Sequence, residues 1–228
     1  MQIFMKITTL IISLISIIHS VVAQDSTLSA VTQQLLKIDE LDQRYRNQIG
    51  YIETKYGRDS KEIQTLYKKM DSADLINLVH VKSIIEKYGW LGYNEIGNQA
   101  NTAIFLVIQH SDKATQEKYL PLMREAVKNG KAKASALALL EDRVALQQGR
   151  MQNYGSQVLW SSTKNKYFIF PLDDPDNVDK RRTAVGLQSL AEYVSAWNIK
   201  WDVEQYKNDL PLIIVECNRY FPNCCSKF

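Results

Sequence analysis

Apolar residues recur at steps of three and four along most of this chain, and this spacing restricts the fold more than any other feature. Leu28, Val31, Leu35 and Ile38 begin the first such stripe, which runs to residue 49. Residues three or four apart share one face of an α-helix, so each stripe predicts an amphipathic helix with one buried side. Further stripes predict helices over 60–70, 72–86, 94–108, 112–129, 131–148 and 178–197.

Two short β-rich runs interrupt this helical pattern. GSQVLWSS (155–162) and KYFIFPL (166–172) are separated only by Thr163, Lys164 and Asn165, which predicts a hairpin. The tail DLPLIIVECNRYF favours neither a strand nor a short helix, because periodicity does not decide between them. The sequence therefore predicts a mainly α protein, a single-domain multi-helix array with one small β-hairpin element near 156–171.

The first residues have the pattern of an export signal. After Lys6 comes ITTLIISLISII, an uncharged run of about a dozen residues. Small residues follow, with Val21 and Ala23 placed for a cut before Gln24. We therefore expect a signal peptide over 1–23, cleavage near Ala23–Gln24, and a periplasmic or extracellular protein. The remainder reads as one mainly helical domain over 24–198 and a C-terminal extension over 199–228.

Charge and motif content exclude several classes of protein. The formal net charge is +3, and one of those charges belongs to Lys6 in the predicted signal. KNGKAK (128–133) and DKRR (179–182) are short and mixed, so no basic patch predicts a nucleic-acid partner. No apolar segment after the signal approaches membrane-spanning length. No phosphate loop, dinucleotide fingerprint or HExxH zinc motif occurs, so we expect no cofactor and no metal.

All three cysteines lie in the last dozen residues. Cys217 has either Cys224 or Cys225 within reach, whereas a bond between the two neighbouring cysteines would be strained. Export permits a disulfide, and the spacing has no metal-binding pattern. The sequence leaves the pairing open.

Four polar clusters interrupt the apolar pattern. They are Asp42-Gln43 with Arg46, then QHSD (109–112), then Asp142-Arg143, then QNYGSQ (152–157). In their order and spacing, GWLG (89–92), FLVIQHSD (105–112), LEDRV (140–144) and QNYGSQ resemble a bacterial domain family of unknown function. That family is often found in exported proteins. DQRYR (42–46), DNVDKRR (176–182) and GLQSLAEY (186–193) fit its pattern as well, so the resemblance covers roughly 42–193. It implies one domain and a set of positions, and it carries no mechanism.

The QHSD cluster has two main interpretations. His110 at the end of an apolar helix can bond the last carbonyls, and Asp112 is a good N-cap for the next helix. The cluster would then be a joint that satisfies its own backbone. Alternatively, His110 is an acid or base, because its ordinary pKa suits proton transfer near neutrality. A third interpretation is a metal site that includes His110 and Asp112, although these two side chains are few ligands for a metal ion.

Asp142 is equally ambiguous, since a buried charge is costly unless it is paired. It can form a structural ion pair, with Arg46 or Arg182 as partner. It can instead orient His110, while Arg143 or Arg182 clamps an anionic group.

Two hypotheses of function follow from these clusters, and whether any reaction is catalysed stays open. The first is an exported, polar-pocket domain that binds a small polar ligand and is hydrolase-like, with His110 as base and Asp142 as its orienter. Its ligand-binding residues would be Gln109, Asp112, Arg143, Gln152, Tyr154, Gln157 and Arg182. The second is a non-catalytic structural or protein-interaction module, in which the same groups form a buried network that pins helices together.

Overall fold

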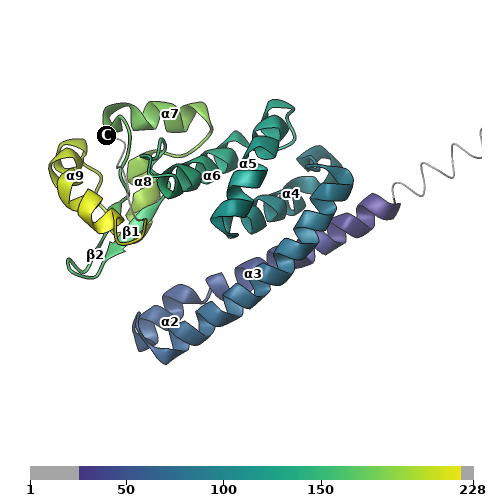
Figure 1. Ribbon diagram of the computed structural model, residues 1–228, viewed down its shortest axis with the longest axis horizontal. Coiled ribbons are helices and arrows are strands. Elements are labelled where there is room, and N and C mark those ends of the chain that lie inside the picture. The colour runs from purple at the N-terminus through teal and green to yellow at the C-terminus, as the bar shows by residue number, and fades with distance from the viewer. Residues whose placement is uncertain (1–25, 222–228) are drawn as a thin grey trace, which may run out of the picture. The chain divides into compact units, whose positions relative to one another are not determined.

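The computed structural model describes residues 26–221, and these are mainly helical with one two-stranded antiparallel sheet (Figure 1). The expected mainly α fold with one small hairpin is confirmed. The chain divides into two compact units between Val107 and Ile108. The single domain expected over 24–198 and the extension over 199–228 stay predictions.

Unit 1 is built from helices. A helix over 26–46 is followed by α2 (Ile49–Tyr56), α3 (Lys61–Tyr88) and the greater part of α4 (Tyr93–Gln109). The Ser60 side chain caps α3 by accepting from the Ile63 N–H, and Gly89 ends it at φ 70°. A positive φ suits glycine, which has no Cβ. The predicted stripe Val31, Leu35 and Ile38 is buried.

Several helix boundaries predicted from sequence are wrong. The first helix ends at residue 46 instead of 49, and the stretch predicted as one helix over 178–197 is divided into α7 (Val178–Ala184), α8 (Leu190–Val194) and η2 (Ser195–Trp197). We expected a break near Asp71-Ser72, but α3 is continuous over 28 residues. The Ser72 hydroxyl donates to the Lys68 carbonyl one turn earlier, at 2.9 Å, instead of capping a new helix. A serine inside a helix can make this bond without ending the helix. The break lies in α4 instead, where Gly97 has non-helical backbone angles.

Unit 2 combines short helices with the hairpin. Its elements are α5 (Lys113–Lys128), α6 (Ala134–Gln147), β1 (Val158–Ser161), β2 (Lys166–Ile169), η1 (Pro175–Asn177), α7 (Val178–Ala184), α8 (Leu190–Val194), η2 (Ser195–Trp197) and α9 (Val203–Cys217). β1 and β2 pair antiparallel, with Leu159 opposite Phe168. Pro121 lies inside α5 without dividing it.

The core of unit 2 joins α6, the hairpin and the last helices. Leu146, Leu159, Phe168, Leu190 and Ile213 belong to one buried cluster. The tail that periodicity left undecided is helical, since α9 supplies part of this cluster.

The end of α9 carries a disulfide bond. Cys217 at the end of α9 is buried and disulfide-bonded, and its partner lies outside the described residues. The predicted signal peptide over 1–23 lies outside them as well.

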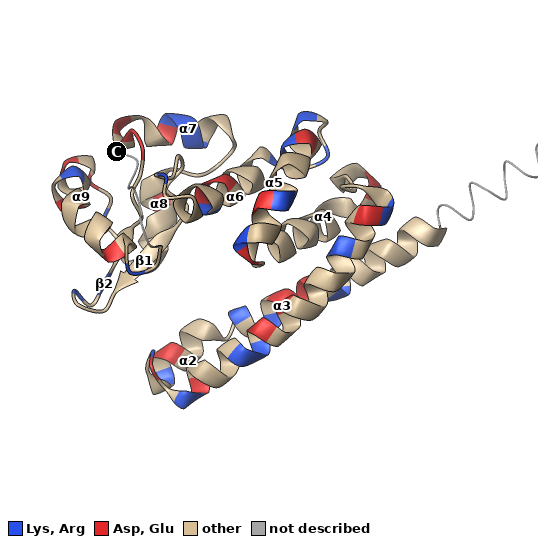
Figure 2. Ribbon diagram, in the orientation of Figure 1, with Lys and Arg blue, Asp and Glu red and all other residues tan. Residues whose placement is uncertain are grey.

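Within 26–221, none of the helices has the length and apolar character needed to cross a membrane. Acidic and basic residues are mixed along α2, α3 and α5, whereas most of α4 is uncharged (Figure 2).

Candidate functional site

Asp142 anchors the segment QNYGSQ, which we call the 152–157 loop. Asp142 lies on α6 and is fully buried. Its Oδ1 accepts from the backbone N–H groups of Asn153, at 2.7 Å, and Tyr154, at 3.0 Å. Its Oδ2 accepts from the N–H of Ser156, at 2.9 Å, and more weakly from Tyr154, at 3.2 Å. Both carboxylate oxygens are therefore used to hold one loop against α6.

Two opposing effects act on the Asp142 carboxyl. Burial raises its pKa above the ordinary value, because a charge loses hydration in the interior. The N–H groups of Ser156, Tyr154 and Asn153 lower it, since they stabilise the charged form. Burial is the larger effect.

Gln152 closes the loop on itself and on the hairpin. Its amide is fully buried, and Nε2 donates to the carbonyls of Gln157, at 3.1 Å, and Phe170, at 2.9 Å. Its Oε1 accepts from the Gln157 N–H at 2.9 Å. The Gln157 side chain donates to the Ser156 hydroxyl at 3.0 Å. The two glutamines thus satisfy the polar groups of the loop and of the hairpin.

Arg182 holds the loop from the opposite direction. It lies on α7, is fully buried, and donates from Nη1 to the Tyr154 carbonyl at 2.6 Å and from Nε to the Gln188 carbonyl at 2.7 Å. Its guanidinium lies over the Tyr193 ring at 4.8 Å, a cation–π distance. The Tyr193 hydroxyl donates to the Ser156 carbonyl at 2.8 Å. Within the described chain, Nη2 of Arg182 has no hydrogen-bond partner.

Gly155 completes the tight shape of the loop. Its φ is 68°, and a Cβ at this position would lie 2.9 Å from Cδ1 of Leu190. The positive φ therefore favours glycine here, and a Cβ would in addition force the buried Leu190 side chain to shift. The carbonyl of Asn153, two residues before Gly155, accepts from Nε of Arg181 at 2.8 Å, so α7 restrains the loop twice.

QHSD forms the predicted joint between α4 and α5. The Asp112 side chain caps α5 by accepting from the Thr115 N–H at 2.7 Å, as the sequence indicated. Gln116 Nε2 donates to the carbonyls of Gln109, at 2.9 Å, and Ser111, at 2.7 Å, which are left open where α4 ends.

The remaining predicted site residues lie in unit 2 as well. His110 is half-buried at the end of α4, and the donors to Asp142 given above do not include it. Arg143 follows Asp142 on α6 and is half-buried. Burial raises the pKa of the Tyr154 phenol, and the charges of Glu141 and Asp142 add to that effect. The catalytic role of His110 and Asp142 stays a prediction, as do the ligand contacts.

Asp42 and Arg46 form a second network, in unit 1. Arg46 makes a bidentate pair with Asp74 of α3, at 2.9 and 2.6 Å, and lies 3.2 Å from the Asp42 carboxylate. Gln43 donates to Asp42 at 2.6 Å. Sequence reasoning missed Asp74, although it precedes the buried Asn77 by one helical turn.

Comparison with known proteins identifies a family. The model described as "Family of unknown function (DUF6624)" matches residues 29–203. The expectation of a domain family of unknown function is confirmed, whereas the motif pattern and the link to export stay predictions. Neither the curated proteins nor the solved structures contain a significant match.

Proposed function

We propose a role for this chain from the geometry of its buried side chains. The chain belongs to the DUF6624 family, and the function of that family is unknown. The role is that of an exported, non-catalytic binding module whose buried polar side chains fix the shape of its surface. One observation carries the proposal: both carboxylate oxygens of Asp142 accept N–H groups of the 152–157 loop. A carboxylate that orients a catalytic imidazole instead accepts a hydrogen bond from the ring N–H with one of its oxygens.

The bonds of the neighbouring side chains support the same role. Gln152 and Arg182 also bond backbone groups, and both are fully buried. Buried networks of this kind rigidify a fold and specify one arrangement of it. The hydrolase-like alternative needs these groups to face a ligand.

A test of catalysis uses chromogenic esters, phosphate esters and glycosides. A binding module turns over none of them above the uncatalysed rate. Turnover by the native chain that His110→Ala abolishes would overturn the proposal. A preparation of His110→Ala made in parallel shows whether any rate belongs to a contaminant, because a contaminant is unaffected by the substitution.

The structural role of Asp142 is measured by amide hydrogen exchange. Asp142→Asn should accelerate exchange within residues 152–157, since their N–H groups lose a charged acceptor. The control Glu141→Gln changes the adjacent residue, which is partly exposed and pairs with Arg124 at 2.8 Å instead of bonding the loop. Equal exchange in both variants would contradict the role.

Export is part of the proposal and has its own test. Residues 1–23 should direct a fused reporter enzyme out of the cytoplasm, and the exported chain should begin at Gln24. Replacing the uncharged run with one that contains lysines serves as the control. A reporter that stays inside with the native segment would remove export from the proposal.

A further inference from the structure

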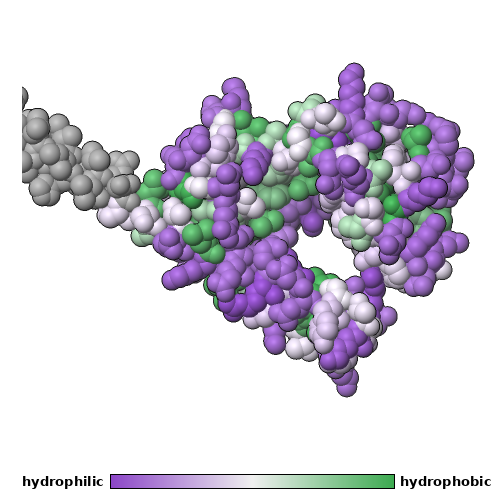
Figure 3. Space-filling model, turned by 180° about the vertical axis from the view of Figure 1, so that it is seen from behind, coloured by the Kyte–Doolittle hydropathy of each residue, from purple (hydrophilic) through white to green (hydrophobic). Residues whose placement is uncertain are grey.

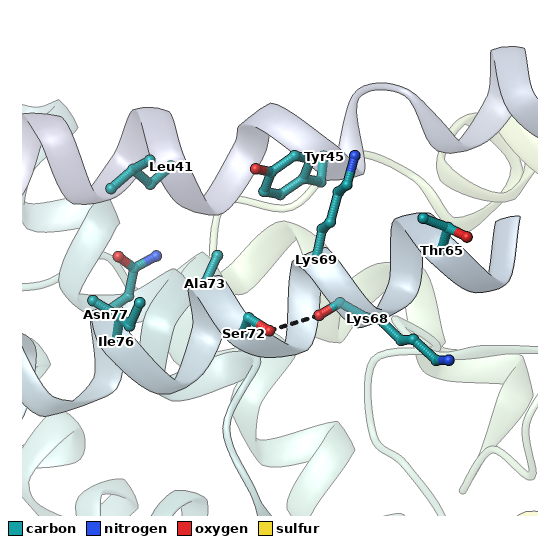
Figure 4. A pocket seen from close by; sticks show the side chains of 9 residues that line it. All are labelled: Leu41, Tyr45, Thr65, Lys68, Lys69, Ser72, Ala73, Ile76 and Asn77. Atoms are coloured by element: carbon teal, nitrogen blue, oxygen red, sulfur yellow. Dashed lines mark hydrogen bonds between the residues drawn. The ribbon is translucent and has the colours of Figure 1, made fainter. Parts of the chain in front are cut away.

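A pocket lies between the helix over 26–46 and α3, and all its lining residues belong to unit 1. We call it the α3 pocket; its volume is about 430 Å³. Ligand pockets typically enclose roughly 300–1,000 Å³, so this one suits a small molecule. Figure 4 shows the lining residues Leu41, Tyr45, Thr65, Lys68, Lys69, Ser72, Ala73, Ile76 and Asn77.

The middle of the α3 pocket is apolar. Leu41 and Tyr45 are one turn apart on the first helix, and they lie opposite α3, which contributes Ala73 and Ile76 (Figure 4). Ile76 remains 58 % exposed. Apolar side chains also reach the surface elsewhere among hydrophilic ones (Figure 3). An exposed isoleucine beside a hollow gains most from a ligand that covers it with apolar atoms.

One end of the α3 pocket holds an unsatisfied amide. Asn77 is 1 % exposed, yet within residues 26–221 neither its Nδ2 nor its Oδ1 has a hydrogen-bond partner. A buried polar group without a partner costs about 1–3 kcal/mol. A ligand with a hydroxyl or an amide at this point would satisfy it.

The other end is positively charged. Lys68 and Lys69 are both exposed, and no ion pair with another described residue engages either of them. They lie eight or nine residues from Asn77, which on a helix is about 12 Å. The nearby carboxylate of Asp74 is already paired with Arg46, so it does not neutralise these lysines.

Two of the three hydroxyls that line the α3 pocket, those of Thr65 and Ser72 but not that of Tyr45, are already used as donors. Thr65 donates to the Lys61 carbonyl at 2.7 Å, and Ser72 donates to the Lys68 carbonyl, as the dashed line in Figure 4 marks. The remaining donors are the Asn77 amide, the Tyr45 hydroxyl and the lysine ammonium groups, of which that of Lys69 points toward the first helix (Figure 4). This arrangement favours an anion at the lysine end over a cation.

We propose that the α3 pocket binds an elongated organic anion with an apolar chain. Its carboxylate lies at Lys69, whose side chain points toward the first helix (Figure 4), with Lys68 adding positive charge nearby. Its chain covers the apolar middle, and a hydroxyl or amide at its far end pairs with Asn77. The proposal rests on the proposed function in that it gives the binding module a ligand. The two fail separately, because the α3 pocket contains no residue of the 152–157 loop or its anchors.

Isothermal titration of the purified chain with three probes tests the ligand class. 10-Hydroxydecanoate should bind once per chain, and decanoate about tenfold more weakly, because it leaves Asn77 unpaired. Decyltrimethylammonium has the same apolar chain and the opposite charge, and it should not bind. Equal binding of all three probes would show an apolar surface without selectivity for charge or for the hydroxyl, and it would overturn the proposal.

Variants test the two polar ends. Lys68→Gln with Lys69→Gln should weaken 10-hydroxydecanoate at least tenfold. The control Lys82→Gln with Lys87→Gln removes the same charge from α3 outside the α3 pocket, and it should bind like the native chain. Asn77→Leu should remove the preference for 10-hydroxydecanoate over decanoate while the chain stays folded.

Three results would overturn the proposal. The first is binding that both double variants weaken equally. The second is a preference for the hydroxyl that survives in Asn77→Leu. The third is a chain that binds no probe but forms dimers that Ile76→Lys dissociates, since the surface would then serve a second copy.

Discussion

Asp142→Asn is the substitution that tests most directly how unit 2 is held together. The native carboxylate accepts from three backbone N–H groups, those of Asn153, Tyr154 and Ser156. An asparagine has one carbonyl oxygen, and its NH₂ group faces donors. At least one buried N–H then loses its acceptor, which costs about 1–3 kcal/mol, and the others lose a charged partner. Burying a neutral amide is cheaper than burying a carboxylate, which offsets part of this loss.

The expected net loss is about 2–4 kcal/mol of the unfolding free energy, out of about 5–15 kcal/mol for a typical domain. Urea unfolding followed by tryptophan fluorescence measures it, because Trp160, Trp197 and Trp201 all lie in unit 2. Glu141→Gln is the matched control and should cost at most about 1 kcal/mol, since its partner Arg124 is 54 % exposed and the pair is only partly shielded from water. An Asp142→Asn value within 1 kcal/mol of this control would refute the structural role of the carboxylate.

Three further predictions concern the same network. Burial raises the pKa of Asp142 in the folded chain above 3.8. The Asp142 carboxyl therefore stays protonated in the folded chain at pH values where it is already ionised in the unfolded chain. The contribution of Asp142 to stability is therefore largest below about pH 4 and falls as the pH rises through the folded pKa, by at most about 1.4 kcal/mol per pH unit. At each pH, the unfolding free energy of Asp142→Asn is subtracted from that of the native chain, and this difference should fall as the pH rises. A difference that rises with pH would contradict the prediction. Gly155→Ala should lower the melting temperature more than Gly186→Ala: both glycines have positive φ, but only a Cβ at Gly155 meets Leu190, and equal shifts would exclude the steric effect. Tyr193→Phe should cost about 1 kcal/mol in urea unfolding, since the carbonyl of Ser156 loses its donor, and an unchanged midpoint would show that the hydroxyl contributes nothing.

Local features of unit 2 and of the helix ends were predictable because their causes are local. Asp112 caps α5 through the N–H of Thr115, three residues away, and an aspartate before a helical stripe is the usual signal for this. The hairpin followed from two β-rich runs and a three-residue connection. Gly89 ends α3 a few residues after the predicted end at residue 86, since a glycine after the last stripe residue permits a positive φ.

The partners of the buried polar groups were not predictable. Asp142 was expected to pair with an arginine or an imidazole, whereas it accepts from N–H groups of residues 153, 154 and 156. Backbone amides look alike at every position of a sequence, so nothing marks these three as donors. Asp74 was missed for a related reason: its pair with Arg46 joins residues 28 apart.

The sequence by itself determined most helical segments and the hairpin, because apolar spacing and caps act within a few residues, but not the continuity of α3 or the helical state of α9. It also placed the polar clusters. Tertiary structure alone decided what those clusters do, since the 152–157 loop reaches Asp142, Phe170 and Arg182 only once α6, the hairpin and α7 have packed. The α3 pocket has the same origin: Asn77 becomes an unpaired buried amide only when the helix over 26–46 lies against α3.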